Sequence, residues 1–219
     1  MSPAAARPEI IVLAGTNGAG KSSVAGEALR LAGGDYFNPD EVASRYGALA
    51  AGASAGQANA WAWNQGRVLL EQAIERRLRF ALETTLGGNT IPGLLLKAAN
   101  VGLPVRMWYV GLSSPELHLE RVRARVGHGG HDIPEPRIRQ RYDTSRQNLI
   151  RLLPHLAELK LYDNSLEFDP KRGEKPRPTL ILHFQRGQLL ATSPLHQVPE
   201  WAKPIVHATS RSFGPPQTS

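Results

Sequence analysis

Short apolar runs alternate with longer amphipathic segments along this chain. Runs of strand length occupy residues 9–14, 36–40, 80–86, 105–112 and 160–164. The segments between them, several with apolar residues spaced three or four positions apart, read as helices; they cover residues 22–31, 41–46, 61–79, 91–100, 114–126 and 133–151. Strands that alternate with helices predict an α/β fold, in which a parallel sheet is flanked by helices.

Three segments add detail to this outline. Residues 179–184 and 188–191 predict a C-terminal hairpin that turns at Arg186 and Gly187. The small residues of 48–60 fit either a loop or a weak helix, and helix 61–79 is expected to bury a face that includes Trp61 and Leu69. We expect a single domain over residues 1–206, with a lid at about 127–146, and a loose polar tail over 207–219.

The first apolar run leads directly into the sequence GTNGAGKS, which matches the phosphate-binding pattern G-x-x-x-x-G-K-[ST] at every fixed position. Glycines let successive backbone N–H groups turn toward an anion, and the helix that follows presents its positive end. Lys21 is expected to reach the β- and γ-phosphates of ATP, and Ser22 to ligate Mg²⁺. The expected nucleotide-binding residues are Gly15, Thr16, Asn17, Gly18, Ala19, Gly20, Lys21, Ser22 and Ser23.

Composition narrows the setting. The chain has 219 residues, no cysteine and a formal net charge of +7. Disulfides and thiolate metal sites are therefore excluded. The apolar runs are too short to span a bilayer, and residues 1–8 lack the apolar region of a signal peptide. These features predict a cytoplasmic protein without a membrane segment.

Positive charge is concentrated between Arg121 and Arg151, where eight arginines face three acidic residues. Arginine forks favour phosphate recognition, and nucleic-acid channels add stacking aromatics, of which this segment has only Tyr142. We therefore interpret the segment as a phosphate clamp on a lid, with nucleic acid as an unfavoured partner. Part of it is also explained by a solvated basic face.

Two carboxylates fall where strands end, and strand ends collect on the ligand side of such a sheet. Asp40 fits the base that accepts the proton of an attacking hydroxyl, but it fits a helix cap equally well. Glu83 fits a ligand of substrate hydroxyls or Mg²⁺, or a salt bridge with Arg79 or Arg106. The strands lack the paired acids of a motor ATPase, so a small-molecule kinase is favoured.

Several short motifs, taken together and in order, resemble the zeta-toxin family of P-loop kinases. They are GTNGAGKSS at 15–23, FNPDE at 37–41, ETTL at 83–86, YVGL at 109–112, GGHDIPE at 129–135 and YDNS at 162–165. The resemblance implies a P-loop kinase fold, ATP and Mg²⁺ as cofactors, and phosphorylation of UDP-N-acetylglucosamine on a sugar hydroxyl. It also implies a toxin that a protein antitoxin obstructs.

The same resemblance implies residue roles. Asp40 falls on the catalytic base, Lys21 and Ser22 on the ATP and Mg²⁺ positions, and Glu83 with Thr84 on the acceptor side. Arg125 and Arg141 are the expected catalytic clamps, and Arg121 and Arg139 are expected to bind the nucleotide.

Two residues depart from the family pattern. Thr16 stands where relatives often carry proline, and Thr144 stands where they commonly carry arginine. The loss of a lid arginine keeps other functions open: a kinase with a different acceptor, a nucleotide-binding module without turnover, or a nucleic-acid ATPase.

Overall fold

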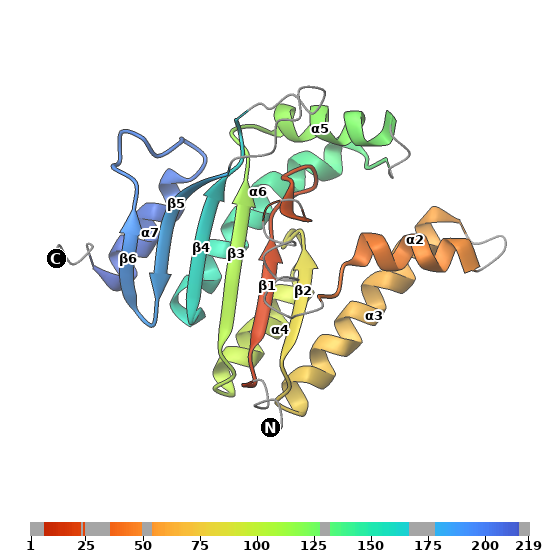
Figure 1. Ribbon diagram of the computed structural model, residues 1–219, viewed down its shortest axis with the longest axis horizontal. Helices are drawn as coiled ribbons and strands as arrows, with labels where there is room; N and C mark the ends of the chain where they lie inside the picture. Colours follow the sequence, from red (N-terminus) through yellow and green to blue (C-terminus); the bar gives the residue numbers. More distant parts are fainter. Residues whose placement is uncertain are drawn as a thin grey trace, which may run out of the picture.

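The computed structural model describes residues 7–22, 24, 36–49, 54–127, 132–166 and 178–214. It contains a six-stranded sheet in the order β2-β1-β3-β4-β5-β6 (Figure 1). The strands are β1 (Ile10–Ala14), β2 (Phe80–Thr84), β3 (Val105–Gly111), β4 (Glu158–Asp163), β5 (Thr179–Gln185) and β6 (Gln188–Thr192). The predicted α/β class and the C-terminal hairpin are confirmed.

The first four strands of the sheet are parallel, and the hairpin is added to them antiparallel. β1 pairs with β2 and β3 on its two sides, so that Ile10 lies between Phe80 and Val105. β3 pairs in parallel with β4, which pairs antiparallel with β5. Every residue of β1 is buried, which explains its continuous apolar sequence, since a central parallel strand is covered on both faces.

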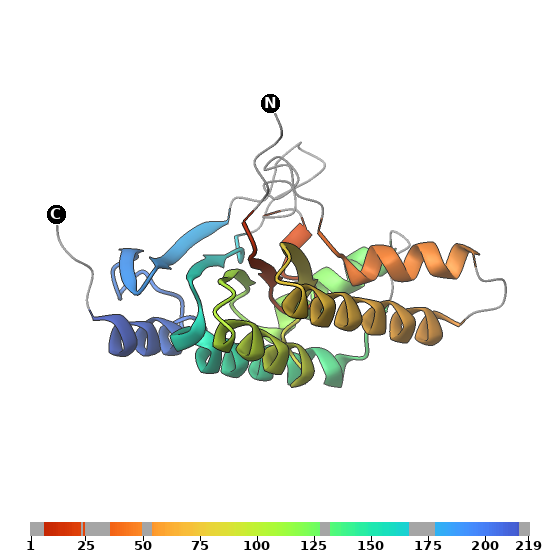
Figure 2. The same cartoon turned by 90° about the horizontal axis from the view of Figure 1, so that it is seen from below.

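Helices form a layer against one face of the sheet. Figure 2 shows α3 (Ala55–Glu75), α4 (Thr90–Asn100), α6 (Glu135–Leu152) and α7 (Lys203–Phe213) in this layer, and neighbours in this row are in contact. Leu95, Leu149 and Ile205 are buried beneath them in the main core cluster. α2 (Pro39–Leu49) packs on α3, and the two helices extend beyond the β2 edge of the sheet (Figure 1).

The last two described helices of the lid region are α5 (Pro115–Gly127) and α6, near the carboxyl ends of the parallel strands (Figure 1). The predicted lid at 127–146 includes residues 128–131, which lie outside the described residues, so its boundaries stay a prediction. Most of the helix predicted at 22–31 also lies outside them. No helix among the described residues combines the length and apolar character needed to cross a membrane.

Three expectations are wrong. The predicted strand at 36–40 is reduced to a bridge between Phe37 and Leu82, because Pro39 already begins α2. In α3 the buried face is built largely from small residues, and Trp61 and Leu69 are 40% and 38% exposed. The tail expected to be loose from His207 is helical to Phe213, because its apolar residues complete the core.

The segment after β4 completes the fold. Trp201 is buried, and its indole Nε1 donates to the Asp163 carboxylate at 3.0 Å. Its ring lies over Gly111, where an added Cβ would come within 2.3 Å of a ring carbon. This segment therefore covers the C-terminal end of β3.

Candidate phosphate and acceptor site

The glycine-rich loop follows β1 and turns beneath the start of α5. A Cβ on Gly15 would lie 2.1 Å from the Val110 carbonyl oxygen, and φ is +141° there, so only glycine fits. Gly18 and Gly20 also have positive φ, of 81° and 79°. A Cβ on Gly18 would meet the His118 carbonyl oxygen at 2.8 Å. The loop is therefore held in its turned conformation by β3 and α5 around it.

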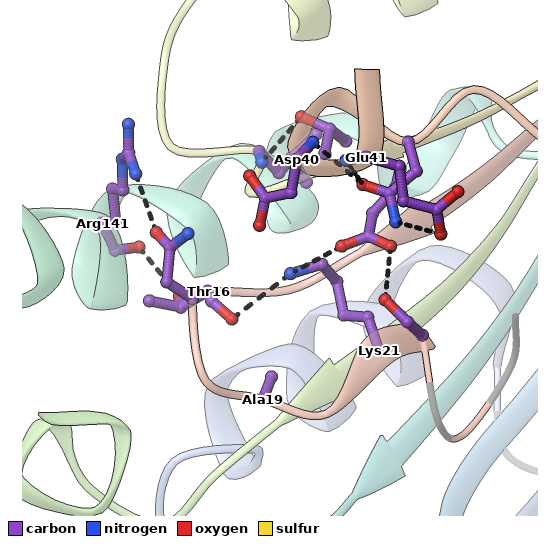
Figure 3. A network of polar contacts seen from close by, with 12 residues as sticks. Thr16, Ala19, Lys21, Asp40, Glu41 and Arg141 are labelled. Atoms are coloured by element: carbon purple, nitrogen blue, oxygen red, sulfur yellow. Dashed lines mark hydrogen bonds and ion pairs between the residues drawn. The ribbon is translucent and has the colours of Figure 1, made fainter. Parts of the chain in front are cut away.

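Lys21 and Ser22 both contact Glu83. The Lys21 ammonium is buried, 3.4 Å from Glu83 Oε1 and 3.5 Å from the Thr16 carbonyl oxygen (Figure 3). The Ser22 hydroxyl donates to Glu83 Oε2 at 2.9 Å. Glu83, at the end of β2, thus faces the loop, whereas Arg79 and Arg106 instead pair with Glu9.

Asp40 lies in the first turn of α2, but the cap of that helix is Asn38. The Asn38 side-chain oxygen accepts hydrogen bonds from the backbone N–H groups of Asp40 and Glu41, at 3.0 and 3.4 Å. The Asp40 carboxylate instead accepts a bond from Arg125 Nη1, at 3.3 Å. Its side chain is therefore directed toward α5 and is not used to cap α2.

These groups line one cavity of about 290 Å³. Its walls are Asn17, Gly18, Gly20, Lys21, Ser22, Asp40, Glu83, Arg121 and Arg125. Backbone N–H groups, an ammonium and two guanidinium groups surround a space of the size a polyphosphate needs, with a carboxylate beside them. We refer to it as the phosphate cavity.

A second cavity, of about 330 Å³, lies beside the first, and Glu83 lines both. The floor is formed by Leu82, Thr84 and Leu86 of the β2 end, and Phe37 and Trp63 contribute aromatic walls. Arg67, Arg137, Gln140 and Arg141 add polar groups. A mainly apolar pocket with a few polar groups is typical of a small-molecule site. We refer to it as the acceptor cavity.

Arg141 connects α6 to the loop. Its Nη1 donates to Asn17 Oδ1 at 2.7 Å, and its backbone carbonyl accepts from the Thr16 hydroxyl at 3.3 Å (Figure 3). Burial and the nearby Arg137 lower the pKa of Arg141, and the Asp40 carboxylate opposes that shift. Arg141 remains a cation, because the pKa of arginine starts far above neutral pH.

His118 of α5 is the other neighbour that holds Asn17. Its Nδ1–H donates to the Asn17 carbonyl oxygen at 2.7 Å. Burial lowers the pKa of His118 to about 4, and the charges of Lys21, Arg121 and Arg146 act in the same direction. The imidazole is therefore neutral at physiological pH and acts as a fixed hydrogen-bond donor.

The remaining expected residues have varied positions. Arg121 lines the phosphate cavity and donates to the Leu166 carbonyl at 3.3 Å. Thr84 lines the acceptor cavity, and its hydroxyl accepts from the Leu86 N–H. Arg139 instead bonds Glu116 and Glu135, at 2.7 and 2.8 Å, and does not line either cavity as described. Ser23 lies outside the described residues. Thr144 donates to the Gly87 carbonyl at 3.0 Å.

The residues present fit a magnesium ion that arrives with a nucleotide. Such an ion is bound by one or two protein oxygens together with phosphates. The Ser22 hydroxyl and the Glu83 carboxylate offer hard oxygen donors side by side next to Lys21. Elsewhere in the described ranges no group of three or more His, Cys, Asp or Glu could hold a metal ion.

Sequence reasoning missed two supports of the loop and most of the acceptor cavity. His118 looked like an ordinary residue of a lid helix, and Asn164 was seen only as part of a motif. The Asn164 amide donates to the Ala19 carbonyl at 3.0 Å. One available signal was Gly66, a glycine inside a helical pattern: a Cβ there would lie 2.7 Å from the Phe37 ring.

Comparisons with known proteins agree with this geometry. The sequence model of the zeta toxin family matches residues 1–164. An uncharacterized protein of Haemophilus influenzae is 38% identical over 74 residues, which is 34% of this chain and 53% of that protein. The chain thus spans about half the length of this curated relative.

Two solved structures share the fold. A chain of the AvrRxo1-ORF1:-ORF2 complex with ATP has a TM-score of 0.64 at 18% identity, over 97% of this chain and 65% of that one. A chain of the PezAT toxin–antitoxin system of Streptococcus pneumoniae has a TM-score of 0.55 at 16% identity, over 80% of this chain and 75% of that one. The fold and the family match support an ATP-dependent phosphotransferase, and the chain belongs to the zeta toxin family.

Proposed function

We propose that this protein is a kinase that transfers the γ-phosphoryl group of ATP to a sugar hydroxyl of UDP-N-acetylglucosamine. One observation carries the proposal: the phosphate cavity, with Lys21 and Asp40 in its wall, adjoins the acceptor cavity at Glu83. An acceptor hydroxyl can therefore approach the terminal phosphate held by the loop, which is the arrangement that in-line transfer needs.

Each residue has a role in the proposed step. Asp40 accepts the proton of the acceptor hydroxyl, whose oxygen bonds to the γ-phosphorus while the bond to the β–γ bridging oxygen breaks and ADP leaves. Lys21 and the loop N–H groups hold the β- and γ-phosphates. Arg125 and Arg141 supply positive charge to the transferring group. Magnesium, when bound at Ser22, neutralises phosphate charge and orients the nucleotide.

The acceptor class is proposed from the lining of the second cavity. Phe37 and Trp63 offer aromatic surface for a base or a sugar face. Arg137 and Arg141 offer guanidinium groups for a diphosphate. Arg67 is held by Glu71 at 2.7 Å and fixes the wall near Trp63. A ligand with both apolar rings and a diphosphate satisfies these features, and a nucleotide sugar is such a ligand.

The test is transfer of labelled phosphate from [γ-³²P]ATP in the presence of Mg²⁺. We expect a labelled product with UDP-N-acetylglucosamine and none with the Lys21→Ala variant. A product with another small molecule but not with this one would replace the acceptor and keep the kinase. ATP binding without transfer to any acceptor would indicate a binding module, and hydrolysis stimulated by DNA or RNA would indicate a nucleic-acid ATPase.

We further propose that the protein acts in the cytoplasm as the toxin of a toxin–antitoxin pair. The support is the family match and the printed description of the PezAT structure as a toxin–antitoxin system. Induced expression of the wild type is expected to arrest bacterial growth, whereas Asp40→Asn is not. Equal arrest by both proteins would separate any toxicity from phosphoryl transfer.

A further inference from the structure

The Asn17 residue of the glycine-rich loop is a junction between both lid helices and the two cavities. It is 7% exposed and lines the phosphate cavity. Its backbone carbonyl accepts from His118 on α5, and its side-chain oxygen accepts from Arg141 on α6, both at 2.7 Å. The second of these bonds leads out of the phosphate cavity, because Arg141 lines the acceptor cavity.

The rest of Arg141 is fixed by packing. Its aliphatic stem lies on Gly87, where an added Cβ would come within 2.6 Å of Arg141 Cγ. Its backbone carbonyl accepts from Thr16. The stem therefore has one path, and the Asn17 amide determines where the guanidinium at its end is held.

The chemistry of the Asn17 side chain suits a support for a phosphate-binding cation. A neutral amide oxygen takes up one donor of a guanidinium, which has five. The other donors and the full positive charge stay available. A carboxylate in the same place would pair with Arg141 and repel phosphate oxygens.

We propose that Asn17 is a positioning residue: its side-chain amide holds the Arg141 guanidinium at the border of the two cavities, within reach of the phosphoryl group in transfer. The inference rests on the proposed function, because it needs Arg141 to meet that group. It assigns the Asn17 side chain to the lid and leaves nucleotide binding at this position to the backbone.

A double-mutant cycle tests the proposal, with ATP affinity and turnover measured separately on the full chain. Asn17→Ala should lower kcat about 10-fold, the size expected for loss of a hydrogen bond to a charged group. The Kd for ATP should stay within about twofold, because the loop N–H groups are unchanged. In the Arg141→Ala background, Asn17→Ala should have no further effect.

Guanidinium rescue gives a readout that a merely structural role would not move. Added guanidinium ions should restore part of the activity of Arg141→Ala, and this restoration should disappear in the double variant. Asn100→Ala and Arg151→Ala, on exposed positions of α4 and α6, serve as matched controls. If Asn17→Ala unfolds, Asn17→Ser replaces it, since it also lacks an oxygen at the position of Oδ1.

Three results would overturn the inference: multiplied effects in the double variant, an ATP affinity that falls as much as kcat, or rescue that persists without Asn17. Turnover is measured both as transfer to UDP-N-acetylglucosamine and as ATP hydrolysis without acceptor. Coupling seen in hydrolysis without any transfer would remove the proposed acceptor and keep the inference. Transfer with independent effects would do the opposite, and a wild type with neither activity would contradict both.

Discussion

Arg125 Nη1 lies 3.3 Å from Asp40 Oδ2, and both residues line the phosphate cavity. This contact joins α5 to the first turn of α2 across the glycine-rich loop. The candidate base and a candidate charge-stabilising group therefore meet at the place where the terminal phosphate is expected. Both side chains are about half exposed in this structure, so their attraction is weak and leaves them free to bind substrates.

Arg125 is expected to act in turnover and not in folding. Arg125→Ala should lower kcat by about 10²- to 10³-fold, as loss of a donor to developing charge does. The free energy of unfolding should change by less than about 0.5 kcal/mol, because the Asp40 pair is exposed. Steady-state kinetics and urea unfolding measure the two effects.

Arg123→Ala is the matched control for this prediction. Arg123 lies two residues away on α5, is 72% exposed and pairs with Glu135. It should retain wild-type kcat. Equal losses in the two variants would mean that α5 contributes general basic charge and no specific clamp.

Glu83 connects the two cavities, and its charge is expected to oppose nucleotide phosphates before magnesium is bound. Glu83→Gln removes a negative charge 3.4 Å from the Lys21 ammonium. Affinity for ATP in the absence of Mg²⁺ should rise severalfold, because repulsion between like charges is lost. Calorimetric titration with and without Mg²⁺ measures this, and a weaker affinity without metal would contradict the prediction.

Trp63 and Trp201 are expected to give opposite phenotypes. Trp201 is 3% exposed and packs on Gly111, so Trp201→Ala should destabilise the fold by about 3–5 kcal/mol. Trp63 is 47% exposed and lines the acceptor cavity, so Trp63→Ala should raise the KM for the acceptor with little loss of stability. Urea unfolding and acceptor titration separate the two. A Trp63→Ala variant with unchanged KM would remove that wall from the acceptor site.

Stability should depend on the protonation of His118. The pKa of this imidazole is about 4 in the folded protein, against an ordinary 6.5, because it is buried. Between these values the unfolded chain binds a proton that the folded one does not. Stability is therefore complete above pH 6.5 and falls as pH drops toward 4, by up to about 1.4 kcal/mol per pH unit from this group.

His118→Asn tests this dependence, since asparagine does not titrate. Urea unfolding of both proteins between pH 7.5 and 4.5 should show the wild type losing stability faster below pH 6.5. A constant difference between the two across this range would contradict a buried neutral imidazole.

The loop and its partners illustrate what the sequence can and cannot predict. The positions of Gly15, Lys21 and Ser22 follow from local spacing, because their chemistry depends on consecutive backbone groups. The contact between Asn17 and Arg141 spans 124 residues and depends on the rotation of α6, which no local pattern specifies. Arg139 shows the same limit, because two residues of helix rotation direct it to Glu116 and Glu135 instead.

Packing between helices was the other source of error. In α3, the small residues Ala58, Ala62 and Gly66 are buried, and large apolar neighbours are exposed. A pattern based on residue size favours the opposite face, since it does not know that α2 and Phe37 approach closely. The β1 strand and the C-terminal hairpin were predicted well because continuous burial and a tight turn leave a direct signature.

The central claim is that the Asp40 carboxylate activates the acceptor hydroxyl. The most direct measurement is a single-turnover transfer assay with [γ-³²P]ATP on Asp40→Asn, combined with the Kd for ATP and with Asp143→Asn, an exposed α6 carboxylate, as control. We predict a rate of transfer about 10²- to 10⁴-fold lower, an ATP affinity within about threefold of wild type, and an unaffected control. Transfer at the wild-type rate, or an ATP affinity that falls as far as the rate, would contradict the claim.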